Sequence, residues 1–79
     1  MNTPWKYKIF IAWSADNVKS EAFLTVFAAK KWMRAVALEF GDSADISVVT
    51  SDNKAMYAES INEAICDFKL VTLGGGGNE

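Results

Sequence analysis

The fold depends on residues 18–28, which read Val18-Lys-Ser-Glu-Ala-Phe-Leu-Thr-Val-Phe-Ala28. As a strand, this segment alternates between two faces, with Phe23 on one face and Ala22 on the other. As a helix, it would be capped by Ser20 and run on to Phe40, with apolar residues every three or four positions. The first interpretation gives a β-hairpin followed by a short helix, and the second gives one long helix.

We favour the hairpin, because a helix from Ser20 to Phe40 would be apolar around nearly its whole circumference, which a small domain can hardly bury. One observation favours the long helix instead. A short helix from Lys30 to Phe40 would place lysines at its positive end and Glu39 near its negative end, at a cost of about 0.3–1 kcal/mol each. In a long helix these lysines would lie in the middle.

The segments on either side of this stretch give clearer patterns. Residues 5–13 alternate lysines with aromatic and β-branched side chains, which predicts a strand, and residues 14–17 form a turn cluster. Gly41 predicts the end of the first helix. Asp45 to Thr50 is rich in β-branched residues and predicts a short strand.

A second helix is predicted from Asn53 to Asp67, capped by Ser51 or Asp52. Six apolar side chains fall within about 120° of arc at 100° per residue. They are Tyr57, Ala58, Ile61, Ala64, Ile65 and Phe68. Lys69 to Leu73 predicts a final strand. We therefore expect an α+β protein with the order strand-strand-helix-strand-helix-strand, in which two amphipathic helices pack on a single-layer sheet. The alternative is βαβαβ with one long first helix.

The length and composition indicate one small domain. Of 79 residues, 51% are hydrophobic and 23% are charged, close to a globular average. We expect a single α+β domain over residues 1–73 and a flexible glycine-rich tail over residues 74–79. We find no internal repeat in the sequence. The longest apolar run is far shorter than the roughly 20 residues needed to span a bilayer, so we expect a cytoplasmic protein without a membrane partner.

Several kinds of chemistry are excluded by residue type. The chain has no His and a single Cys, Cys66, which excludes imidazole catalysis, an intramolecular disulfide and a cysteine cluster for a metal. The carboxylates lack a neighbouring nucleophile or metal signature, so we expect no enzyme activity, no cofactor and no metal site. A basic group beside Trp32 is compatible with nucleic-acid contact, but we expect Trp32 to face the core and predict no direct nucleic-acid binding.

The charge distribution is uneven along the chain. Residues 1–34 carry six basic and two acidic residues, whereas residues 35–79 carry two basic and eight acidic ones. On the predicted second helix, Glu59, Glu63 and Asp67 recur every four residues and form an acidic ridge. This ridge is either a solvated face that keeps the protein soluble or a negative surface for a basic partner. The candidate partner-binding residues are Glu39, Asp42, Asp45, Asp52, Glu59, Glu63 and Asp67.

Two short segments carry a family resemblance. Thr25-Val-Phe-Ala28 runs into an amphipathic helix, and Ile46-Ser-Val-Val-Thr50 follows it. In a short, acidic, histidine-free α+β chain, this arrangement resembles the small proteins of phages and mobile elements, among them anti-CRISPR proteins. The resemblance covers the whole chain without a diagnostic motif. It implies a stoichiometric inhibitor, in the cytoplasm of a bacterial host, that occupies a nucleic-acid or partner surface of a nuclease complex.

A second resemblance covers the ends of the chain. Ile9-Phe-Ile-Ala-Trp-Ser14, with Asp16, is similar to the first strand of Toll/interleukin-1 receptor domains, and residues 59–72 are similar to their second helix and third strand. The glycine-containing loop before that helix and the part with the catalytic Glu are missing here. The resemblance therefore does not imply NAD hydrolysis, and it implies at most a truncated decoy.

Together these observations predict a small non-catalytic protein-interaction module. We expect an inhibitor of the anti-CRISPR type that binds a basic, nucleic-acid-binding surface of a bacterial defence complex through its acidic face. One alternative is a homo-oligomeric structural or regulatory protein, joined through strand edges or aromatics such as Trp5 and Trp13. The other is the truncated Toll/interleukin-1 receptor-like decoy. Each of these interpretations is compatible with a homodimer.

Overall fold

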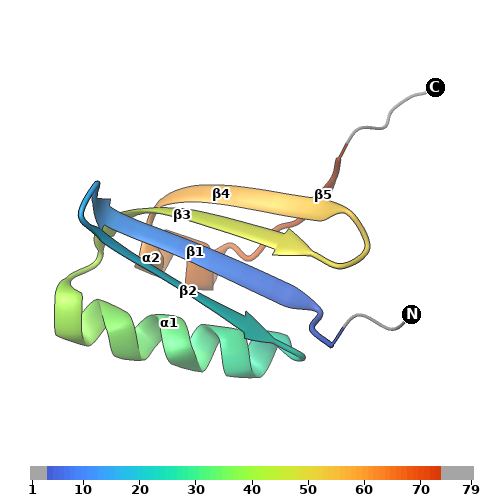
Figure 1. The fold of residues 1–79 in the computed structure, drawn as a ribbon, viewed down its shortest axis with the longest axis horizontal. Helices are drawn as coiled ribbons and strands as arrows, with labels where there is room; N and C mark the ends of the chain where they lie inside the picture. The colour runs from blue at the N-terminus through green and yellow to red at the C-terminus, as the bar shows by residue number, and fades with distance from the viewer. Residues whose placement is uncertain (1–3, 74–79) are drawn as a thin grey trace.

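A five-stranded sheet and two helices make up the computed structural model, which describes residues 4–73 (Figure 1). The elements are β1 (Tyr7–Ser14), β2 (Asn17–Phe23), α1 (Val26–Phe40), β3 (Ser43–Thr50), β4 (Lys54–Ser60), α2 (Ile61–Cys66) and β5 (Val71–Thr72). The expected α+β class, with one sheet packed by two helices, is confirmed.

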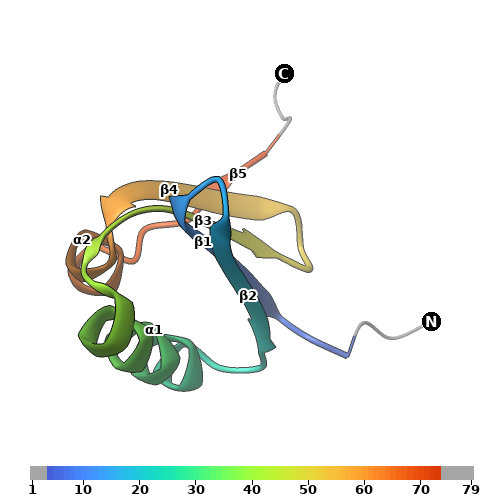
Figure 2. The ribbon, with the colours of Figure 1, turned by 60° about the vertical axis from the view of Figure 1, so that its left-hand side comes forward.

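The sheet has the strand order β2-β1-β3-β4-β5, and every neighbouring pair is antiparallel. The element order strand-strand-helix occurs twice, although no repeat is visible in the sequence. Because β1 and β3 pair at the centre, the two units are related by an approximate two-fold axis normal to the sheet. Such an axis places both helices on the same face, as Figure 2 shows.

The core lies between this face and the helices. Alternate residues of a strand point to opposite faces, so Ile9 and Ile11 of β1 point to the helices together with Ile46 and Val48 of β3. These four side chains and Met33 of α1 are at most 1% exposed. Burial of apolar area of this kind supplies most of the stability of a small domain.

The hairpin interpretation of residues 18–28 is confirmed, but α1 begins earlier than expected. Its first residue is Val26 rather than Lys30, because the Thr25 side chain accepts a hydrogen bond from the Ala28 backbone N–H at 3.1 Å and caps the helix. Lys30 therefore lies in the second turn, away from the positive end. Gly41, with φ of 103°, ends α1 as predicted.

The face of β2 that points to α1 is identified by its aromatic contact. The Phe23 ring lies 5.6 Å from the Trp32 ring, and both side chains pack against the core, as predicted for Trp32. Leu24 and Phe27 remain exposed, at 66% and 77%. The strand β2 ends at Phe23, and the chain then crosses to the covered face of the sheet, where α1 begins.

The predicted helix over residues 53–67 is wrong in its first half, which is the strand β4. Met56 and Ala58 are buried on the covered face, whereas Tyr57 between them is 72% exposed, and this alternation is that of a strand. The turn before β4 also favours a hairpin. Asn53 adopts a positive φ of 65°, and the Lys54 backbone N–H donates to Thr50 Oγ1 at 2.9 Å.

The helix α2 begins only at Ile61 and is held there by a variant of the capping box, in which Glu63 reaches back to Glu59 rather than to the N-cap Ser60. Ser60 Oγ accepts from the Glu63 N–H at 3.0 Å, and Glu63 Oε1 accepts from the Glu59 N–H at 3.3 Å. Asp42 adds a further acceptor, because its Oδ1 lies 2.6 Å from the Asn62 backbone nitrogen. The Ile61 N–H donates to the Asp42 backbone carbonyl at 2.9 Å, so the first three N–H groups of α2 all have acceptors, from backbone and side chains.

The remaining boundaries differ from prediction by a few residues. β1 begins at Tyr7 rather than Trp5, β3 begins at Ser43, and β5 covers only Val71–Thr72. The expected tail over residues 74–79 lies outside the described residues, as do residues 1–3 of the expected domain. Between residues 4 and 73, no helix is long and apolar enough to cross a membrane.

Candidate functional site

Four acidic residues gather beside β4 and are called the acidic edge below. They are Asp45 of β3, Glu59 of β4, Glu63 of α2 and Asp67, which follows α2 directly. All four are exposed.

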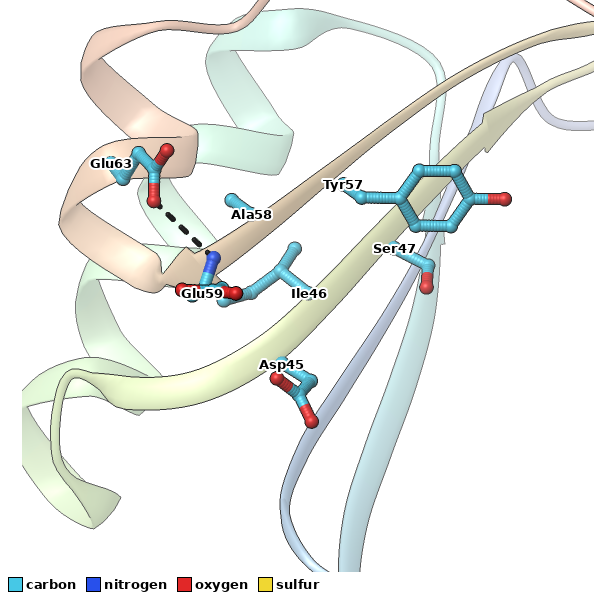
Figure 3. A pocket seen from close by; sticks show the side chains of 7 residues that line it. All are labelled: Asp45, Ile46, Ser47, Tyr57, Ala58, Glu59 and Glu63. Carbon is cyan, nitrogen blue, oxygen red and sulfur yellow. Dashed lines mark hydrogen bonds between the residues drawn. The ribbon is translucent and has the colours of Figure 1, made fainter.

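Two adjoining grooves connect these residues. An open groove of about 440 Å³ is lined by Asp45, Glu59 and Glu63 together with Tyr57 (Figure 3). A second groove of about 300 Å³ is lined by Glu63 and Asp67, again with Tyr57. Tyr57 and Glu63 therefore belong to both grooves, and the four carboxylates line the same two grooves as this exposed aromatic side chain.

The fold positions each side chain through local backbone geometry. The alternation of β4 directs Tyr57 and Glu59 to the face of the sheet opposite the helices, and Asp45 points the same way from β3. Glu63 is fixed by the capping box, in which one of its carboxylate oxygens accepts from the Glu59 N–H. The other oxygen stays available to a partner.

The grooves lie beside a strand edge that is largely unpaired. β5 pairs with β4 only through Lys54 and Ala55. Between residues 4 and 73, no strand pairs with the outer edge of β4 from Met56 to Ser60. This edge is therefore bordered by the acidic side chains and α2 rather than by another strand.

The acidic edge is not neutralised by ion pairs in the described part of the chain. The ion pair found there joins Lys54 to Asp52, at 3.9 Å, in the hairpin turn. Lys69 lines the second groove with Glu63 and Asp67, but it forms no ion pair with either of them. The acidic edge thus carries four carboxylates, with Lys69 as the one basic residue among the described residues that line the two grooves.

The other three predicted residues do not belong to this group. Asp42 caps α2 and lines a separate groove with Arg34. Asp52 lies in the β3–β4 turn, where the hydrogen bond from the Thr50 hydroxyl lowers the pKa of its carboxyl group, with a further contribution from Lys54. Glu39 is exposed near the end of α1.

The prediction that the acidic ridge lies on one helix is therefore wrong. Glu59, Glu63 and Asp67 do not share one helix, because Glu59 belongs to a strand and Asp67 lies beyond the helix end. The hairpin and the short helix still bring them to one edge. Tyr57 was assigned to the buried stripe, and its place between the grooves was missed. Two signals in the sequence mark the boundary that places Tyr57 on a strand. They are the alternation around Tyr57 and the capping-box spacing of Ser60 and Glu63, which marks the start of the helix.

The spacing of the carboxylates suits a surface contact. Within residues 4–73, no three His, Cys, Asp or Glu side chains converge closely enough to hold a metal ion together. The acidic edge instead spreads its charges over two grooves and three elements. Such a distribution fits several separate cationic side chains better than one ion.

Three comparisons with known proteins gave no match for this chain: a scan against family models, a search of curated proteins and a search of solved structures. The functional inference therefore draws on the geometry and charges described above.

Proposed function

We propose that this chain is a small non-catalytic protein-interaction module whose acidic edge binds a basic surface of another protein. One observation carries the proposal: four exposed carboxylates line two adjoining grooves together with Tyr57, and none forms an ion pair in the described residues. Like charges on one surface repel each other weakly, and a cationic partner relieves that repulsion.

Tyr57 gives the acidic edge an apolar centre. Interfaces bury aromatic side chains at their centre and keep charged groups at the rim, where they steer the encounter and set specificity. Tyr57 is 72% exposed and lines both grooves of the acidic edge. A partner with an apolar spot surrounded by lysines or arginines is the complement of this surface.

The partner class follows from the same charges. Basic protein surfaces that bind nucleic acids hold phosphates with lysine and arginine side chains. A group of carboxylates presents negative charge to such a surface in place of phosphates. Together with the resemblance to phage inhibitors, this supports a bacterial defence complex as the partner, blocked at its nucleic-acid-binding surface. No observation favours the alternative of a truncated Toll/interleukin-1 receptor-like decoy.

The proposal is tested by affinity capture from bacterial lysate at low and high salt. The test variant carries Glu59→Gln, Glu63→Gln and Asp67→Asn, which removes three charges at nearly constant shape. The side-chain amide oxygen introduced by Glu63→Gln still accepts the Glu59 N–H, so the capping box remains. We expect the wild-type chain to retain a specific partner at low salt and release it at high salt, and the variant to retain little at either.

A control variant separates the acidic edge from net charge. Asp16→Asn, Glu21→Gln and Glu39→Gln remove three exposed charges elsewhere, so both variants have the same net charge. We expect the control to capture the partner as the wild type does. Equal capture by both variants, with both folded by circular dichroism, would reject the acidic edge as the binding site.

A further inference from the structure

The face of the sheet opposite the helices, called the open face below, has no layer over it within residues 4–73 (Figure 2). Its central row contains Phe10 of β1, Ser47 of β3 and Tyr57 of β4, in register. Phe10 is 39% and Tyr57 72% exposed, and Val18 of β2 is 56% exposed on the same face. The open face therefore presents two exposed aromatic side chains on either side of Ser47, and no element of the described chain covers them.

Opposite charges lie at the two ends of the open face. In the β1–β3 register, Lys8 pairs with Val49 on one side of the central row, and Ala12 pairs with Asp45 on the other. The Lys8 ammonium lies 4.7 Å from the centre of the Trp5 ring. In the described part of the chain, neither Lys8 nor Asp45 forms an ion pair.

We propose that the open face binds a second copy of this chain, sheet against sheet, about a two-fold axis that crosses the strands along the row of Phe10 and Ser47. This rotation places the Lys8 end of one copy over the Asp45 end of the other, and gives two equivalent ion pairs. The two Phe10 side chains meet near the axis, between sheets about 10 Å apart. Each copy covers the apolar row that the other leaves exposed.

The charges select this arrangement over the other two-fold stacking. An axis along the strands would bring Lys8 beside Lys8 of the second copy, and Asp45 beside Asp45 of the second copy. Like charges placed opposite each other destabilise a contact, whereas opposite charges stabilise it. The positions of Lys8 and Asp45 thus specify one orientation of the two sheets.

Other occupants fit the open face less well. A nucleic-acid strand would stack on Phe10 and Tyr57, but Asp45 and Glu59 on the same face repel its phosphates.

One of the two aromatic side chains proposed from the sequence for oligomer contacts, Trp13, is already engaged within the chain. Trp13 donates its indole N–H to the Gly41 carbonyl at 2.7 Å, and its ring packs 5.2 Å from the Phe40 ring. Trp13 is therefore not free to join two copies, and the open face is the better surface for a second copy.

Sedimentation velocity over a range of protein concentrations tests the proposal. All forms carry Cys66→Ser, because the free Cys66 is exposed and an intermolecular disulfide would mimic a dimer. We expect the otherwise wild-type chain to dimerise. Lys8→Glu and Asp45→Lys should each raise the dissociation constant about tenfold, since each disrupts two symmetric pairs. The double variant restores the pairs in reverse and should return the constant to about the wild-type value.

Two further variants keep the test decisive. Phe10→Glu should give a folded monomer, checked by circular dichroism. Leu38→Glu, on the solvent side of α1 where Leu38 is 90% exposed, should leave the dimer unchanged. A chain that is monomeric at every concentration overturns the proposal, and so does a dimer that Leu38→Glu dissociates while the Lys8 and Asp45 variants leave it intact. The dimer covers Tyr57 and Asp45, so a basic partner and a second copy would compete for this surface. The sedimentation assay needs no other partner, and the acidic-edge variants leave Asp45 unchanged, so the two proposals are tested by separate measurements.

Discussion

The two faces of one sheet differ in what covers them. Val48 and Val49 are neighbours on β3 with the same side chain, yet Val48 is fully buried beneath the helices and Val49 is half-buried on the open face. The covered face is closed by α1 and α2 and holds the monomer together. The open face and the adjoining acidic edge hold exposed aromatic and charged side chains, which contribute little to the core and are available to other molecules.

The largest expected effect on stability comes from a Val→Ala substitution, which removes two methyl groups and is made once on each face of the sheet. Val48→Ala should lower the free energy of unfolding by about 2 kcal/mol, because it removes buried apolar surface and leaves a cavity. Val49→Ala should cost less than about 1 kcal/mol, since solvent reaches that side chain. Urea unfolding at low protein concentration, where the proposed dimer is dissociated, measures both. Equal losses of unfolding free energy in the two variants would contradict the difference proposed between the two faces.

A smaller effect is expected where α2 begins. Ser60→Ala removes the acceptor of the Glu63 N–H and should cost about 1 kcal/mol, a usual value for a lost cap. Ser47→Ala is the matched change on the open face, where the hydroxyl caps no helix, and it should stay within about 0.5 kcal/mol of the wild type. Thermal unfolding of the two variants checks this, and a larger loss for Ser47→Ala would contradict it.

The smallest effect concerns the β3–β4 turn, which neither helix covers. The pKa of Asp52 lies below its ordinary value of 3.8, chiefly through the Thr50 hydroxyl, so the ionised carboxylate stabilises the folded state. This contribution is present above pH 3.8 and is lost as the pH falls through the lowered pKa. Asp52→Asn should therefore be less stable than the wild type at neutral pH, and the difference should disappear in acid. A difference that persists in acid would exclude this origin.

Much of the fold follows from local sequence. The alternating residues of β1, the hairpin before α1 and the stop at Gly41 were all predicted, because each is set by neighbouring residues. The start of α1 was misplaced by four residues. Thr25 is the cap, but Ala28 stands where a Glu would complete a capping box, so the signal is weak.

Residues 54–60 show why the remainder was missed. Apolar residues from Tyr57 to Phe68 fit a helical period, but the period spans two elements that meet at Ser60. The pairing of β4 with β3 settles the structure of this segment, and that long-range contact cannot be read from the local pattern. Of the seven acidic candidates, four meet at one edge because the chain folds there, and three already have local roles or lie apart.

The central claim is that the acidic edge, rather than net charge, recognises a basic partner. Calorimetric titration of the captured partner over a series of salt concentrations tests it directly, with the wild type, the Glu59/Glu63/Asp67 variant and the control variant. We predict that the affinity of the wild type and the control falls steeply as salt rises, while the edge variant binds more weakly and with a flatter salt dependence. Wild-type affinity and an unchanged salt dependence in the edge variant would contradict the claim.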